Sequence, residues 1–298
     1  AKVDARGFGR YLAHDYDELA DCPFELGRFW CGQFEVRGVP HRLVVSGAGD
    51  FADCEQLLRD TQRICETEIA FWHPDGAAPP FTSYLFLLHA SQDGYGGLEH
   101  RNSTALVCQR SDLPRRGSAQ ETPATSRRQA SDGYTTLLGL ISHEYFHTWN
   151  VKRLRPREFK RYDYDRENYT ELLWFFEGFT SYYDDLLLLR AGLIDEPAYL
   201  QLLGKTINQL LQTPGRQVQS VAQASFDAWV KYYRIHENTP NATVSYYTKG
   251  ALVAMCFDLT LRAEGHSTLD AVMRELWAQT SGGPMKEADF ARALKRLG

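Results

Sequence analysis

The stretch from Tyr134 to Asn150 constrains the fold of this chain more than any other. It contains the pattern H-E-x-x-H, formed by His143, Glu144 and His147. On an α-helix, residues i and i+4 lie on one face, so the two imidazoles can bind one metal ion together. Glu144 lies one step around the helix, where its carboxylate reaches a water on the metal rather than the metal itself. The spacing is typical of zinc peptidases, and we expect a largely buried helix with a zinc site.

A catalytic zinc site needs a third protein ligand and one open position. Glu177 offers that ligand, because it lies in the aromatic sequence W-F-F-E-G-F-T at 174–180, where a lone carboxylate is costly. The alternative for Glu177 is an ion pair with a buried arginine or lysine. Zinc lowers the pKa of water, and Glu144 can take the proton. Ser181 or Asp184 can orient a ligand histidine by accepting a hydrogen bond from its second nitrogen, although Asp184 is equally well explained as a solvated carboxylate.

The composition is that of a soluble globular protein, with 298 residues of which 43% are hydrophobic and 24% are charged. A net charge of -5 gives no electrostatic case for nucleic acid or anionic membranes. No run approaches the ~20 apolar residues of a membrane-spanning helix. The start, Ala1 to Asp4, lacks an initiator Met and an apolar signal core, which predicts a piece of a longer polypeptide.

The six cysteines are scattered without a C-x-x-C pair, and we expect them to be mostly buried thiols, with one or two disulfides as the alternative. The compartment therefore stays open between the cytoplasm, which is slightly favoured, and a secreted or periplasmic location.

Strand patterns before about residue 133 and helix patterns after it predict an α+β fold with two lobes. We expect residues 1–32 to be an irregular linker or the end of a preceding region, residues 33–133 to form a β-containing lobe, and residues 134–298 to form a helical lobe with the zinc site. Strands are predicted at 33–36, 42–46, 81–90 and 103–109. Further helices are predicted at 51–71 with Asp50 as N-cap, 171–193, 197–212, 246–264, 268–279 with Ser267 as cap, and 287–297, and residues 225–233 are predicted to form a helix or a turn. The polar residues 111–133 are predicted to form a long surface loop.

Several motifs resemble the glycyl aminopeptidase family of zinc metallopeptidases, which belongs with the gluzincins. They occur in order as D-Y-D-E-L at 15–19, H-E-Y-F-H-T-W-N-V-K-R-L-R-P at 143–156, W-F-F-E-G-F-T at 174–180 and Y-Y-T-K-G-A at 246–251. The resemblance implies a thermolysin-like catalytic domain with an active-site cleft between its lobes. Family members commonly carry an N-terminal β domain and a C-terminal PDZ domain, and we expect neither here. We interpret 153–170 as an insertion that forms a solvated loop.

The resemblance also gives roles to two more segments. Gly96, Gly97 and Glu99 lie in a stretch similar to the segment of aminopeptidase N in which a strand edge pairs with the substrate and a glutamate binds its free α-amine. His100 departs from that pattern, so its role is open. Tyr247 matches the tyrosine that faces the oxyanion in aminopeptidase N, with the adjacent Tyr246 as the alternative.

The resemblance implies a zinc-dependent aminopeptidase that removes N-terminal residues, small ones such as Gly or Ala, from peptides with a free N-terminus. One alternative is a zinc endopeptidase of the same fold. Another is a non-catalytic peptide-binding module with a structural zinc ion. The role of His236 is open.

Overall fold

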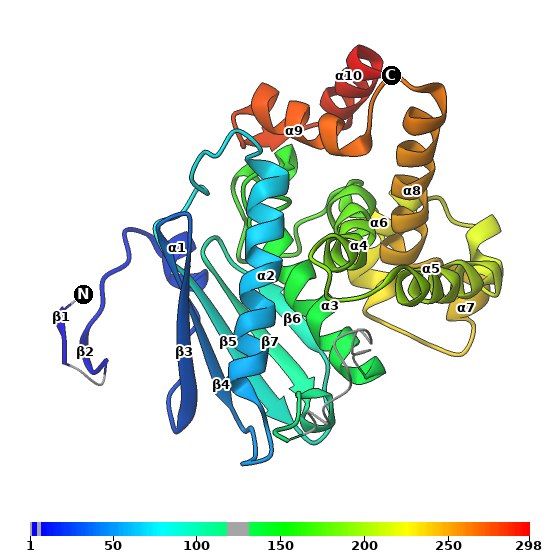
Figure 1. The fold of residues 1–298 in the computed structure, drawn as a ribbon. Coiled ribbons are helices and arrows are strands. Elements are labelled where there is room, and N and C mark those ends of the chain that lie inside the picture. The colour runs from blue at the N-terminus through cyan, green and yellow to red at the C-terminus, as the bar shows by residue number, and fades with distance from the viewer. Residues whose placement is uncertain (1, 5–6, 118–130) are drawn as a thin grey trace.

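A computed structural model describes residues 2–4, 7–117 and 131–298. Its main β structure is a five-stranded sheet (Figure 1). The strands in chain order are β3 (Phe29–Val36), β4 (Val39–Ser46), β5 (Tyr84–Ser91), β6 (Gly96–Glu99) and β7 (Ser103–Gln109). Their spatial order is β3-β4-β5-β7-β6, so the short strand β6 lies at one edge.

The inner strands β4 and β5 each contain a run of residues that is buried on both faces of the sheet. β5 runs parallel to β4 and to β7, whereas β3 and β6 pair antiparallel with their neighbours. Successive residues Leu43, Val44 and Val45 are only 0%, 5% and 1% exposed, and Phe86 to Leu88 follow the same pattern. A continuous apolar run rather than an alternating one is what a parallel strand inside a sheet requires.

The helix that carries H-E-x-x-H lies between the sheet and the helical part of the chain. α2 (Cys54–Trp72) connects β4 to β5 and lies along the sheet, and α3 (Asp132–Phe146) contacts α2, β6 and β7 (Figure 1). On its other side α3 packs against α4 (Leu173–Arg190), which in turn packs closely against α8 (Tyr246–Glu264). The sheet edge, α3, α4 and α8 therefore follow one another in space.

Shorter elements complete the described residues. The other α-helices are α1 (Tyr16–Ala20), α5 (Glu196–Leu211), α6 (Val221–Phe226), α7 (Thr239–Ala242), α9 (Leu269–Thr280) and α10 (Glu287–Leu297). The 3-10 helices are η1 (Arg110–Asp112), η2 (Arg157–Lys160) and η3 (Pro214–Gln217), and η4 (Ala228–Tyr232) is a π-helix. Two small sheets pair β1 (Lys2–Val3) with β2 (Gly9–Arg10), and β8 (Arg155–Pro156) with β9 (Pro284–Met285).

Several predicted boundaries are wrong. α2 begins at Cys54 and is capped by Asp53, not Asp50, because residues 50 and 51 form a turn and Ala52 pairs with Arg115 in an isolated bridge. The cap of α9 is Thr268 rather than Ser267. The segment 225–233, predicted to be a helix or a turn, is divided between α6 and η4. The first two predicted strands are longer than expected, and residues 1–32 contain β1, β2, α1 and the start of β3.

The predicted insertion at 153–170 is not simply a solvated loop. Leu154 is fully buried, and β8 pairs with β9 from the far end of the chain. Arg153 donates hydrogen bonds to three carbonyl oxygens. The segment therefore ties α3 to the rest of the molecule.

Three further expectations concern the cysteines, the loop predicted at 111–133 and membrane-spanning helices. Only three of the six cysteines are buried, although all six are free thiols. Most of the loop predicted at 111–133 lies outside the described residues. Among the described residues, no helix combines the length and the apolar character that crossing a membrane would need.

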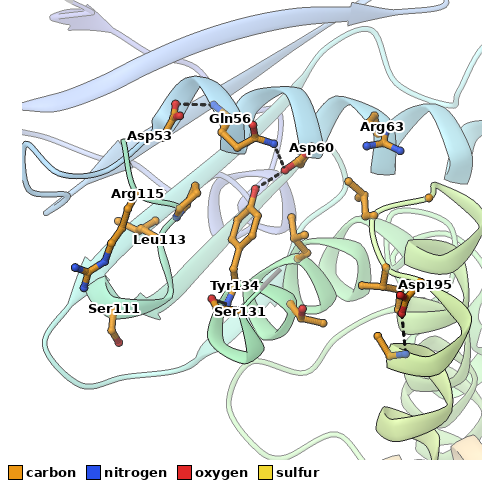
Figure 2. Close-up of a pocket in the computed structure, with 17 residues that line it drawn as sticks. Asp53, Gln56, Asp60, Arg63, Ser111, Leu113, Arg115, Ser131, Tyr134 and Asp195 are labelled. Carbon is orange, nitrogen blue, oxygen red and sulfur yellow. Dashed lines mark hydrogen bonds between the residues drawn. The ribbon is translucent and has the colours of Figure 1, made fainter. Parts of the chain in front are cut away.

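A cavity of about 730 Å³ lies at the N-terminal end of α3 (Figure 2). The N-caps of α2, α3 and α5, which are Asp53, Ser131 and Asp195, line it. On one wall Tyr134 donates a hydrogen bond of 2.6 Å to Asp60. None of the residues predicted to bind metal or substrate lines this cavity, so its volume says nothing about the predicted site.

Candidate active site

Two helices bring the three predicted metal ligands together. α3 ends at Phe146, and His147 follows as its C-cap, so both histidines lie on the last turn and face α4. The Nε2 atoms of His143 and His147 are 3.1 Å apart. Oε2 of Glu177, on α4, lies 3.3 Å from the first and 3.1 Å from the second.

The far side of each imidazole determines where its proton is. Nδ1 of His143 donates to the carboxylate of Asp184 at 3.0 Å, and Nδ1 of His147 donates to the backbone carbonyl of Asn150 at 2.8 Å. In the neutral tautomer that these bonds select, both Nε2 atoms carry lone pairs. Of the two residues predicted to orient a ligand histidine, Asp184 rather than Ser181 makes the contact, and it is not a solvated carboxylate, because its side chain is only 16% exposed.

Three acceptor atoms therefore converge on one point, and neither neutral imidazole has a proton there to share. The carboxylates favour positive charge at this point. Burial opposes a positive charge on His143, but the carboxylates of Asp184 and Glu177 favour that charge and raise the pKa of His143. Burial would likewise raise the pKa of Glu177, but the two histidines hold it well below its usual range.

The donor set fits a zinc ion. Zinc bonds to histidine nitrogen and carboxylate oxygen at about 2.0–2.1 Å, which places tetrahedral ligand atoms about 3.4 Å apart. The observed separations of 3.1 to 3.3 Å are close to this value. Each of the three residues offers one ligand atom. His147 is buried, and His143 and Glu177 are partly buried. This arrangement leaves a fourth position to a substrate or water.

Two glycines let α4 and α8 approach closely at the site. A Cβ on Gly178 would lie 2.5 Å from Cα of Gly250, and a Cβ on Gly250 would collide with the carbonyl oxygen of Trp174. Gly178 directly follows Glu177, and Gly250 lies three residues after Tyr247 on α8. Neither glycine was singled out from the sequence, although both lie inside motifs that were.

This close contact brings Tyr247 to the metal ligands. Its ring centre is 6.1 Å from that of His143, and burial together with the charge of Glu177 raises its pKa. Tyr246 is 1% exposed, stacks on Tyr247 at 4.7 Å and shares a hydrogen bond with Tyr233. The ring contact with His143 thus belongs to Tyr247 rather than to Tyr246.

Glu144 is buried beside the predicted metal ligands, with one carboxylate oxygen unpaired among the described residues. This oxygen, Oε2, is itself buried. Burial, helped by Glu99 and Glu177, raises the pKa of Glu144 to about 7, although His143 and His147 lower it. A Cβ at position 97 would collide with this carboxylate. Gly97 therefore makes room for Glu144, a reason that differs from the substrate approach expected of it.

Glu99 comes from the edge strand on the other side of α3. Its carboxylate, that of Glu144 and a ring nitrogen of His147 lie within 4.8 Å of one another. Gly96, at the other end of β6, has open space where a side chain would begin. His100 is buried and donates from Nδ1 to Asp21 at 3.1 Å. His236 is exposed and accepts a hydrogen bond from the amide of Asn238.

One buried carboxyl under the site was not found in the sequence. Glu68 on α2 is fully buried, and burial raises its pKa well above the usual range. The hydroxyl of Ser142 lies 3.0 Å from both Glu68 Oε1 and the backbone carbonyl of Asp184. Because a hydroxyl has one proton and the carbonyl only accepts, a neutral Glu68 that donates to Ser142 satisfies both contacts. Within α2, Glu68 lies four residues after Ile64 and three after Cys65, on the apolar face, and this position is the sequence signal that could have found it.

The chain is similar to a known protein family and to a protein of known structure. The sequence model of the M61 glycyl aminopeptidase family matches residues 136–253, which contain α4 and most of α3. Among solved structures, the chain is similar to an aminopeptidase N family protein from Idiomarina loihiensis, with 42% sequence identity and a TM-score of 0.82. That match covers 95% of this chain and 49% of the other, so the chain spans about half the length of this relative. No curated protein sequence matches the chain significantly.

Proposed function

We propose that the chain is a zinc-dependent aminopeptidase, since it is similar to the M61 glycyl aminopeptidase family and to an aminopeptidase N family protein. The observation that carries this proposal is the convergence of three acceptor atoms, from His143, His147 and Glu177, on one point beside a buried carboxylate. A peptide hydrolase is the reaction class that uses such a point together with an adjacent base. Small N-terminal residues, Gly or Ala, are the substrates that the family implies.

His143, His147 and Glu177 would hold the zinc ion. When bound, zinc acts as a Lewis acid on the scissile carbonyl and lowers the pKa of water. Asp184 and the carbonyl of Asn150 keep both imidazoles in the tautomer that can ligate. A positive ion at this point also removes the repulsion among the three lone pairs.

Glu144 is the general base in this proposal. Its carboxylate is one residue along α3 from His143, and its partnerless Oε2 can accept a proton from the attacking water. The same oxygen then returns the proton to the leaving amine. Gly97 keeps the space for the carboxylate open, because any side chain there would displace it.

Tyr247 is the donor to the developing oxyanion. Its hydroxyl stays protonated at neutral pH, since burial and Glu177 both raise its pKa. A fixed donor near the metal ligands stabilises negative charge that forms only in the transition state. The contact between Gly178 and Gly250 fixes the position of this donor relative to Glu177.

Glu99 makes the proposed enzyme an exopeptidase. Its carboxylate lies within 4.8 Å of Glu144, and two carboxylates this close repel each other unless a cation joins them. The ammonium group at a peptide's N-terminus supplies that charge when the peptide lies along the edge strand β6. An internal peptide segment has no such charge, so we expect cleavage to require a free N-terminus.

Paired peptides test the proposal. We expect the protein to hydrolyse Gly- and Ala-peptides with a free N-terminus at least about 100-fold faster than their N-acetylated forms, and Glu99→Gln to remove most of this difference. Equal hydrolysis of both forms by the parent protein would indicate the endopeptidase instead. Zinc binding without hydrolysis of either form would indicate the non-catalytic module. Hydrolysis that survives complete chelation of metal would exclude zinc.

A further inference from the structure

Asp21 joins three separate segments of the chain beside the candidate site. It is the C-cap of α1, and its Oδ1 accepts hydrogen bonds from Nδ1 of His100 at 3.1 Å and Nζ of Lys152 at 2.7 Å. Its Oδ2 accepts the backbone N–H of Arg101 at 2.8 Å. The three interacting side chains are largely withdrawn from water, with 15% of Asp21, 7% of His100 and 15% of Lys152 exposed.

Each partner of Asp21 is attached to a residue of the site. His100 directly follows Glu99 at the end of β6. The backbone N–H of Lys152 donates to the carbonyl of the metal ligand His147 at 3.1 Å. Asp21 therefore connects the segment that carries the amine-binding carboxylate to the segment that carries a metal ligand.

Two arginines reinforce the same junction. The guanidinium of Arg101 lies 3.4 Å from the carbonyl of Lys152, and that of Arg153 donates to the carbonyl of Arg101 at 2.7 Å. These bonds join the turn after β6 to the turn after α3. Asp21 is the acid at their centre, and it stays ionised: burial would raise its pKa, but His100, Lys152 and the amide of Arg101 lower it to about 2.

β6 needs such an anchor. It has four residues, lies at the edge of the sheet, and pairs with only one strand in the described sheet, β7. A short edge strand is held by few hydrogen bonds and moves easily. Nevertheless Glu99, its last residue, must stay within a few ångströms of His147 for both to act on one peptide.

We propose that Asp21 is a positioning residue that fixes the separation between Glu99 and His147. The inference rests on the proposed aminopeptidase function. A peptide bound by its amine at Glu99 meets the metal ligands at a distance that this separation sets, so Asp21 determines which bond is cut. The N-terminal segment is then part of the machinery that distinguishes free from blocked peptides.

Asp21→Asn tests the proposal, because the amide keeps the shape of the side chain but loses the charge and one acceptor. We expect the preference for free over acetylated peptides, as a ratio of kcat/KM values, to fall about tenfold or more, with bound zinc unchanged. We also expect amide hydrogen exchange across β6 to become about tenfold faster. Lys152→Met, which removes one partner but keeps the carboxylate, should change both in the same direction by less.

Asp17→Asn is the matched control. Asp17 is on the same helix and accepts a hydrogen bond from Tyr164 at 2.5 Å. Loss of the charge on Asp17 therefore weakens a contact of α1 without changing a contact of β6. It should leave both readouts at parental values. Parental ratio and exchange in folded Asp21→Asn would overturn the proposal, and if that variant does not fold, parental values in Lys152→Met would do so. A parent protein that cleaves neither peptide would contradict the aminopeptidase proposal, and exchange across β6 would then decide the role of Asp21 by itself.

Discussion

Replacing Gly178 by alanine should separate α4 from α8. The new Cβ would lie 2.5 Å from Cα of Gly250, whereas carbon atoms in contact are about 3.5–4.0 Å apart, so the helices must move by roughly 1 Å. Overpacking of this kind costs about 1–3 kcal/mol, and the better helix propensity of alanine returns about 0.5–1 kcal/mol. The net loss in unfolding free energy is then about 1 kcal/mol, within a range of about 0–2.5 kcal/mol. Because Tyr247 moves with α8, a displacement of 1 Å should lower kcat by about 100-fold.

Urea denaturation and steady-state hydrolysis of an Ala-peptide measure the two effects. The control is Gly204→Ala on α5, where a Cβ meets no atom within 4 Å. It should raise the unfolding free energy by about 0.5–1 kcal/mol and leave kcat unchanged. A Gly178→Ala protein with parental stability and kcat would refute the close contact. Lost stability with parental kcat would refute the role given to Tyr247 but not the close contact between the helices.

Three other substitutions test single interactions. Tyr247→Phe should lower kcat by about 10²–10³-fold in steady-state assays with little change in KM, whereas Tyr246→Phe should leave kcat near its parental value. Asp184→Asn should weaken zinc binding by about 10–100-fold in a chelator competition, and Ser181→Ala should not change it. Burial lowers the pKa of His41 to about 4, so as pH falls from 6.5 to 4 the unfolded chain binds a proton that the folded chain refuses. The resulting loss of stability, about 3 kcal/mol between pH 7 and pH 4, should be absent from His41→Gln in urea titrations.

The sequence predicts the elements whose signals are local. The α+β class is confirmed, and α8 and α10 have their predicted boundaries because Ser245 and Gly265 at the ends of α8 are strong helix signals. Asp53, which caps α2, is a local signal only three residues from Asp50, but the bridge between Ala52 and Arg115 that precedes it joins residues far apart in sequence. The pairing of β8 with β9 depends on distant residues in the same way.

The features of the candidate site likewise divide into those with local sequence signals and those that depend on distant residues. Spacing on one helix predicts that His143 and His147 converge, and the aromatic surroundings of Glu177 point to the third ligand. What the sequence could not supply are contacts between segments: Gly178 with Gly250, Asp21 with His100, and Gly97 against Glu144. The sequence alone does not show whether a glycine is needed to make room for a neighbouring carboxylate or for a substrate. Only the fold distinguishes the two.

Titration of zinc into the chelated protein tests the central claim most directly. The rate of Ala-peptide hydrolysis should rise in proportion to bound zinc and stop rising at one zinc per chain. Glu144→Gln should bind the same single zinc but cleave about 10³-fold or more slowly, and Glu177→Gln should bind it far more weakly. Hydrolysis by the chelated protein, or unchanged zinc affinity in Glu177→Gln, would contradict the account.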